Sequence, residues 1–93
     1  MFVLMVYDID IKRVVRVLKT ARRYLRRVQN SVFEGEISPG RLASLKADLA
    51  GLIEPEYDSV LFYTWRTEKD MICTGMGISV RPSYASGKAV NFI

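Results

Sequence analysis

Residues 3–14, VLMVYDIDIKRV, decide the fold, because an apolar run passes through two acids into basic residues. Residues 2–7 are apolar at every position, a pattern typical of a strand buried on both faces. Asp10 stands directly before a segment with helical periodicity, where it predicts an N-cap. The stretch therefore predicts a buried strand, a corner that contains Tyr7 and Asp8, and a helix from Ile11 to about Tyr24 or Leu25.

The later segments predict the same kinds of element. Residues 26–37, RRVQNSVFEGEI, suit one long bent strand or a tight pair with a break near residues 29–31. Ser38 and Pro39 predict the start of a second helix, whose buried stripe is Leu42, Leu45, Leu49 and Leu52. Residues 59–65, SVLFYTW, predict a further apolar strand, and residues 77–82, GISVRP, a short one.

This order of elements predicts an α+β fold, a ferredoxin-like βαββαβ sandwich with an extra C-terminal strand. Two helices cover only one face of such a sheet, yet the strands at residues 2–7 and 59–65 are apolar on both faces. A second copy of the chain would cover the other face. We therefore expect a twofold homodimer packed sheet to sheet, with residues 67–93 forming a C-terminal strand and tail that pack on the partner subunit.

The composition of the 93-residue chain is that of one globular domain, spanning residues 1–93. Hydrophobic residues make up 49% and charged residues 26%, which is ordinary for a soluble protein. No apolar run approaches the ~18 residues that cross a membrane, and the start MFVLMV predicts a strand rather than a signal peptide. The single cysteine, Cys73, excludes an internal disulfide, favours a cytoplasmic location and predicts a small buried side chain.

The charge of the chain is unevenly distributed. The net charge is +4, but residues 12–27 hold eight basic residues and no acid. A solvated polar face is one interpretation, and a surface for a polyanion such as nucleic acid is the other. Like charges four residues apart repel without a compensating acid, which favours phosphate binding. On a helical wheel an arc of roughly 80° holds Lys12, Arg16, Lys19, Arg23 and Arg26.

Asp8 is the first candidate for chemistry in a sequence that contains no histidine. Without that general base and metal ligand, catalysis would depend on carboxylates, tyrosine, lysine or a bound cation. In one interpretation Asp8 and Asp10 both cap the helix or form an Asx-turn. In the other, Asp10 caps while Asp8 binds a divalent cation, since Mg²⁺ needs few protein carboxylates.

Other side chains also leave two interpretations open. Aromatic rings can either pack in the core or stack on nucleic-acid bases. Both interpretations apply to Tyr7, Phe33, Tyr63 and Trp65. Glu34 and Glu36 share one strand face, where they mark an exposed edge or join a metal site.

Two motifs carry a resemblance to a known family. VYDID after the opening strand, and RVQNSVFEGEI after the basic helix, in a chain near 90 residues, closely resemble the CRISPR-associated protein 2 family over residues 1–66. The resemblance implies a ferredoxin-like homodimer that acts in spacer acquisition. There the dimer bridges two dimers of the integrase subunit, the CRISPR-associated protein 1 family, and supports prespacer DNA. Some members are described as magnesium-dependent nucleases acting on single-stranded RNA or duplex DNA; in others the acid is dispensable for acquisition.

The resemblance also assigns residues. It implies that Asp8, preceded by Tyr7, binds the metal, with one Mg²⁺ shared between two subunits, and it adds Arg27 and Phe33 to the catalytic set. Arg13 and Arg16 correspond to arginines early in the family's first helix. The nucleic-acid-binding set is then Lys12, Arg13, Arg16, Lys19, Arg23, Arg26 and Arg27. Two functions remain open: a metal-dependent endonuclease, and a non-catalytic scaffold for prespacer DNA.

Overall fold

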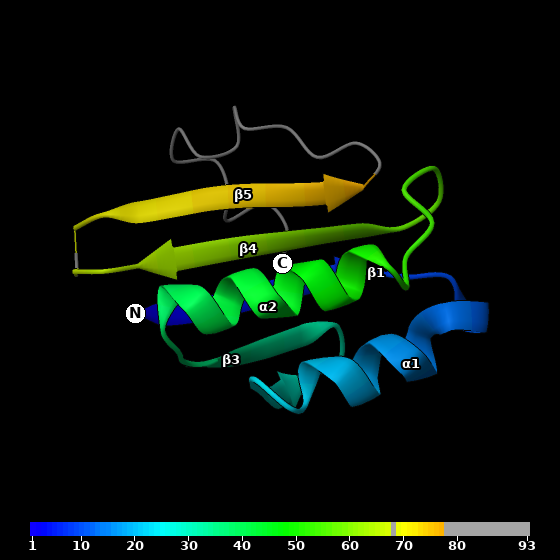
Figure 1. Cartoon of the computed structure of the whole chain (residues 1–93), viewed down its shortest axis with the longest axis horizontal. Helices are drawn as coiled ribbons and strands as arrows, with labels where there is room; N and C mark the ends of the chain where they lie inside the picture. The colour runs from blue at the N-terminus through cyan, green and yellow to red at the C-terminus, as the bar shows by residue number, and fades with distance from the viewer. Residues whose placement is uncertain (68, 78–93) are drawn as a thin grey trace.

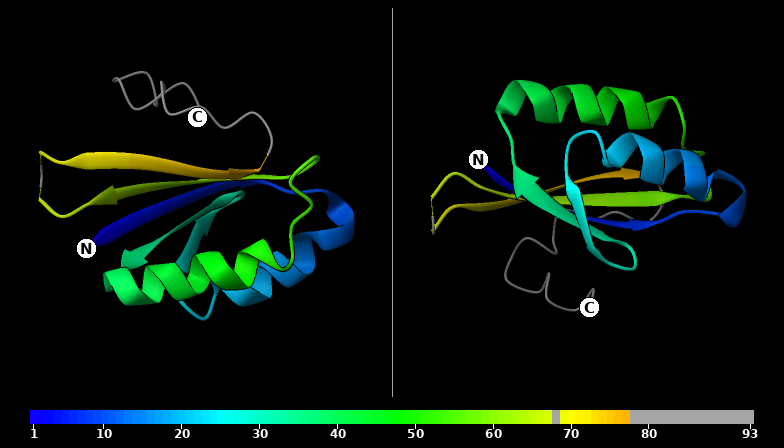
Figure 2. Two further views of the ribbon diagram at one scale, coloured as in Figure 1. Left: turned by 45° about the horizontal axis from the view of Figure 1, so that its top comes forward. Right: turned by 90° about the horizontal axis from the view of Figure 1, so that it is seen from below.

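A computed structural model describes residues 1–67 and 69–77 of the chain, which form a sheet with two helices (Figure 1). The strand order is β2-β3-β1-β4-β5, and every neighbouring pair is antiparallel. Both helices lie on one face of the sheet (Figure 2). The predicted ferredoxin-like α+β fold is confirmed, with β5 added beside β4. In chain order the elements are β1 (Phe2–Asp8), α1 (Ile11–Ala21), β2 (Arg26–Gln29), β3 (Val32–Glu36), α2 (Pro39–Ala50), β4 (Ser59–Trp65) and β5 (Met71–Gly77).

Both helices begin where the sequence predicted. The carboxylate of Asp10 accepts a hydrogen bond of 2.9 Å from the backbone N–H of Lys12, which caps α1. At α2 the hydroxyl of Ser38 accepts one of 3.2 Å from the N–H of Arg41, and Pro39 is the first helical residue. Each cap satisfies a donor that the first turn of a helix would otherwise leave without a partner.

Helix α1 ends earlier than predicted, at Ala21 instead of Tyr24 or Leu25. The chain turns there because Leu25 is buried against the sheet, where Gly35 leaves room for it: a Cβ on Gly35 would lie 3.1 Å from Leu25 Cδ2. Arg23 and Arg26 consequently leave the helical face, since Arg23 lies in the turn and Arg26 in β2. The predicted helical stripe of five cations is therefore a stripe of three, Lys12, Arg16 and Lys19.

The segment after the turn is a tight pair of strands, one of the two predicted arrangements. Gln29 lies opposite Val32, so Asn30 and Ser31 form the connection. Ser31, the second residue of this turn, has a φ of 68°, so the chain reverses through one left-handed residue. The register shifts between Arg27 and Gln29, which marks a bulge in edge strand β2.

Strand β5 is an element that the sequence analysis did not predict. It pairs with β4 of the same chain over its whole length, from Met71 opposite Trp65 to Gly77 opposite Ser59. The sequence predicted a short strand at residues 77–82, which lie outside the described part except for Gly77. Residues 71–77 extend this chain's own sheet, and residues 78–93 lie outside the described part, so the packing of residues 67–93 on the partner subunit stays a prediction. Two glycines and an exposed Ile72 obscure the strand pattern in this segment.

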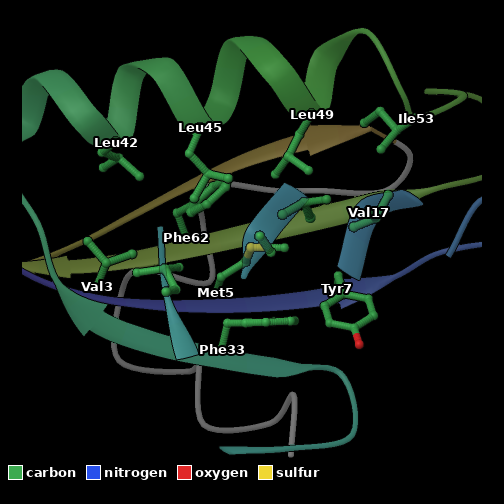
Figure 3. Packing of buried hydrophobic residues seen from close by; sticks show 13 residues of the cluster. Val3, Met5, Tyr7, Val17, Phe33, Leu42, Leu45, Leu49, Ile53 and Phe62 are labelled. Carbon is green, nitrogen blue, oxygen red and sulfur yellow. The ribbon is translucent and has the colours of Figure 1, made fainter. Parts of the chain in front are cut away.

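The buried side chains form one cluster on each face of the sheet. Beneath the helices, Val3, Met5, Phe33 and Phe62 meet the leucines of α2 (Figure 3). The face without helices carries a second cluster, so the prediction of two apolar faces is confirmed. This second cluster, which we call the helix-free cluster, consists of Leu61, Tyr63 and Cys73 packed by Leu4, Val6, Trp65 and Met71. Within residues 1–67 and 69–77, neither helix is long and apolar enough to cross a membrane.

Candidate functional site

Asp8 is the last residue of β1 and lies on the face without helices. Side chains alternate along a strand, and Val3, Met5 and Tyr7 face the helices, so Asp8 shares the other face with Leu4 and Val6. It is exposed and lies opposite Ser59 of β4. Among the described residues, nothing hydrogen-bonds or ion-pairs with the Asp8 carboxylate. The two neighbouring acids therefore have different roles, because Asp10 caps α1 and Asp8 does not.

One chain offers few ligands for a metal ion at this corner. Within the described ranges, no group of three or more His, Cys, Asp or Glu side chains is placed to hold an ion. Mg²⁺ binds one or two protein carboxylates and keeps several waters, so a single exposed carboxylate fits it as part of a sparse site. Asp8 would supply one such ligand, and a second copy of the chain would supply another.

Glu34 and Glu36 do not join Asp8. Glu34 forms a salt bridge of 2.8 Å with Arg26 across the β2–β3 pair, and Glu36 one of 3.2 Å with the N-terminal amine of Met1. β3 lies between β2 and β1, so neither glutamate marks the edge of the sheet; each is instead held in an ion pair.

No role for Asp58 was predicted from the sequence, although it is a buried acid that directly precedes Ser59, the cross-strand partner of Asp8. Its side chain has no exposed area and accepts four hydrogen bonds. Arg13 donates from Nε (2.6 Å) and Nη2 (3.0 Å), and the backbone N–H groups of Asp10 and Glu54 donate at 2.9 Å each. The Arg13 guanidinium and the two N–H groups hold the pKa of Asp58 well below its usual value, against the opposing effect of burial. An acid directly before an apolar strand, in YDSVLFY, is the only sequence signal for this role.

The predicted nucleic-acid-binding residues divide into three groups. Arg13 is committed to Asp58 and Arg26 to Glu34, and Arg27 donates a hydrogen bond of 2.8 Å to Oδ1 of Asn30. The others are exposed, and no carboxylate pairs with them within the residues that the structure describes; they are Lys12, Arg16, Lys19 and Arg23, joined by Arg22. This exposed cationic group covers α1 and the turn after it.

The aromatic residues of the predicted site belong to the two apolar clusters. Phe33 has no exposed area and Tyr7 is buried beside it, with ring centroids 5.9 Å apart. Both rings pack in the core, so neither reaches a substrate in this structure, and of the two interpretations core packing is confirmed. Tyr63 and Trp65 stack on the other face, with centroids 6.5 Å apart. Burial raises the pKa of Tyr63 to about 12.

Comparison with known proteins agrees with these features. A family model described as CRISPR associated protein Cas2 matches residues 1–71. A Thermotoga maritima protein named CRISPR-associated endoribonuclease Cas2 is 47% identical over 78 residues, 84% of this chain and 90% of that protein. One from Dictyoglomus turgidum with the same name is 49% identical over 69 residues, 74% of this chain and 79% of that protein.

Solved structures show the same likeness. A crystal structure described as cas2 has a TM-score of 0.69 and 40% identity, covering 87% of this chain and 93% of its own. Streptococcus pyogenes Cas2, crystallised at pH 6.5, has a TM-score of 0.65 and 37% identity, covering 70% and 86%. The chain therefore belongs to the Cas2 family of CRISPR-associated proteins.

Proposed function

We propose that this chain is a CRISPR adaptation subunit that acts as a nucleic-acid-binding homodimer and cleaves phosphodiester bonds in single-stranded RNA or duplex DNA with Mg²⁺. The observation that carries the proposal is the position of Asp8, an exposed carboxylate without a partner in the described chain, on the face that bears the helix-free cluster. The endoribonuclease names of the relatives support the nuclease. A dimer formed through that face would bring two Asp8 carboxylates toward each other.

The chemistry assigned to the corner follows from its residues. A Mg²⁺ ion bound there would supply positive charge for the reacting phosphate and lower the pKa of a bound water. Asp8 would hold the ion, and with no histidine in the chain no imidazole competes as base. The exposed cations of α1, led by Arg16 and Lys19, would hold the backbone of the substrate without reading its sequence.

The test compares two acids that are two residues apart. In Asp8→Asn we expect RNA and DNA cleavage by rigorously purified protein to fall to the background level, because the metal ligand loses its charge. Asp10→Asn removes the same charge but keeps a good N-cap, so it should cleave like the unaltered protein. Cleavage that is unchanged in Asp8→Asn, or lost equally in both variants, contradicts the assignment.

A second function is favoured by the exposed cationic group. Five basic side chains on α1 and its turn have no carboxylate partner within the described residues, which suits a scaffold that bridges integrase dimers and supports prespacer DNA without cleaving it. The same Asp8→Asn variant separates the two functions in a spacer-acquisition assay. Acquisition that survives it, but collapses when Arg16 and Arg23 are both changed to Glu, supports the scaffold. Arg66→Glu, at the opposite end of the sheet, is the matched control for charge reversal.

A further inference from the structure

The Asp58 carboxylate connects two segments that meet at the Asp8 corner. Its oxygens accept hydrogen bonds from the first residues of α1, at Asp10 and Arg13, and from the loop before β4, at Glu54. A carboxylate that accepts a two-pronged arginine and two backbone N–H groups has its hydrogen-bonding capacity filled. Such a group fixes the relative position of every segment that donates to it.

Asp58 is linked to the backbone around Asp8 in two ways. Along the chain, the N–H of Asp10 is bonded to Asp58 Oδ1 and lies only two residues after Asp8. Across the sheet, Asp58 directly precedes Ser59, which is the cross-strand partner of Asp8. A displacement of the Asp58 side chain would therefore move the backbone on both sides of Asp8.

The end of strand β5 packs against the same corner. Gly77 lies opposite Ser59 and has a φ of 88°. A Cβ on Gly77 would overlap the carbonyl oxygen of Asp58, so the end of β5 is packed directly against the Asp58 backbone. The last residues of β1 and β5 and the first of β4 thus lie in one row beside a filled hydrogen-bond network.

We propose that Asp58, held by Arg13, is a positioning residue that fixes the backbone of Asp8 so that its carboxylate is presented for metal binding. The metal-binding part of this inference rests on the function proposed above. Asp58 acts through Asp8 and touches neither the ion nor the substrate. Arg13 is then a partner of Asp58 rather than a phosphate contact, in contrast to Arg16 on the next turn of α1.

The electrostatics suit this role. Arg13 and Asp58 neutralise each other within one ion pair at 2.6 Å, with side chains 22% and 0% exposed. Such a pair orders the corner while adding little net charge to it. Arg13 is therefore not available to pair with Asp8, and no other described cation forms an ion pair with the Asp8 carboxylate.

The first experiment measures RNA cleavage against Mg²⁺ concentration. In Asp58→Asn and Arg13→Lys the half-saturating Mg²⁺ concentration should rise roughly tenfold or more, as when a partner that orients a metal ligand is lost. RNA affinity in metal-free buffer should not change. Arg66→Lys, the same substitution at an exposed arginine just after β4 that has no proposed contact with the substrate, should leave the half-saturating concentration unchanged. An unchanged Mg²⁺ dependence in both test variants, or a loss of cleavage caused by weaker RNA binding, overturns the proposal.

The second experiment does not depend on cleavage and uses Arg13→Lys, which keeps the charge but loses the forked geometry. Amide hydrogen exchange is followed by NMR at Asp10 and at Ile37, whose N–H bonds to the carbonyl of Met1 at the opposite end of the sheet. Exchange protection should fall roughly tenfold at Asp10 and not at Ile37, because the opening is local. An equal fall at both sites, or none at Asp10, overturns the positioning role.

The two experiments also separate this inference from the proposed function. If the unaltered protein shows no cleavage that depends on Asp8, the nuclease proposal fails. The exchange measurement still decides whether Asp58 and Arg13 fix the corner. Because Arg13→Lys removes only the fork, it also gives an answer if Asp58→Asn does not fold.

Discussion

Asp58 carries its charge inside the protein because donors surround both carboxylate oxygens. The pKa of this carboxyl lies well below its usual value, chiefly through the hydrogen bonds from Arg13, and the folded protein therefore binds its proton more weakly than the unfolded chain does. The stabilisation is complete above the unfolded pKa of about 3.9 and is lost as the pH falls toward the folded value. Acid should weaken the fold partly through this residue.

Urea unfolding at a series of pH values tests that linkage. The unaltered protein should exceed Asp58→Asn in free energy of unfolding by a constant amount between neutral pH and about pH 4.5. Below that pH the difference should shrink, because the unfolded Asp58 carboxylate takes up a proton that the folded one does not. A difference that stays constant down to about pH 2.5 would show that Asp58 is not linked to acid stability.

At the scale of residues, the sequence predicted local roles better than long-range ones. The cap at Asp10 depends only on its position before a helix, and the structure confirms it. The buried pair of Arg13 and Asp58 joins residues 45 positions apart, and no local pattern indicates it. The family resemblance places Arg13 in the nucleic-acid-binding set, whereas in the structure its guanidinium already has a carboxylate partner.

At the scale of elements, boundaries depended on tertiary contacts. Residues 22–25 continue the helical pattern of α1, but burial of Leu25 against Gly35 turns the chain toward β2. In β5, pairing with β4 supplies the order that the glycine-containing segment lacks by itself. The elements with strong periodicity or clear caps, β1, α2 and β4, were predicted with nearly correct bounds.

The close packing between β5 and β4 leads to a prediction about glycine. Gly77→Ala should lower the free energy of unfolding by roughly 1–3 kcal/mol, because alanine is strained at positive φ and its Cβ would overlap the Asp58 carbonyl oxygen. Gly40→Ala is the matched control, since a Cβ at Gly40, in the first turn of α2, meets nothing within 4 Å. It should be neutral or stabilising by up to about 1 kcal/mol. Equal effects of the two substitutions in urea unfolding would contradict this account of β5.

At the scale of the whole molecule, the two faces of the sheet differ. One is covered by α1 and α2 (Figure 2), and the other carries the helix-free cluster together with Asp8 at one end. The exposed cationic group lies on α1 and its turn, on the layer opposite the helix-free cluster. A sheet-to-sheet dimer would therefore enclose the two Asp8 corners between the subunits and leave both cationic surfaces accessible to nucleic acid.

Substitutions on the two layers test this arrangement. Val6 is half-buried on the helix-free face, opposite Leu61, whereas Val15 is exposed on α1. Val6→Glu would place a carboxylate in the apolar contact between two copies, where an unpaired buried charge is costly. In each subunit the new carboxylate would also lie near the negatively charged side chain of Asp8. We expect the unaltered protein and Val15→Glu to be dimers at micromolar concentration, and Val6→Glu to be a monomer with reduced cleavage. Sedimentation velocity measures the oligomeric state of all three proteins. A monomeric unaltered protein, or a dimeric Val6→Glu variant, would show that the helix-free face is not the interface. The two Asp8 corners would then not meet there.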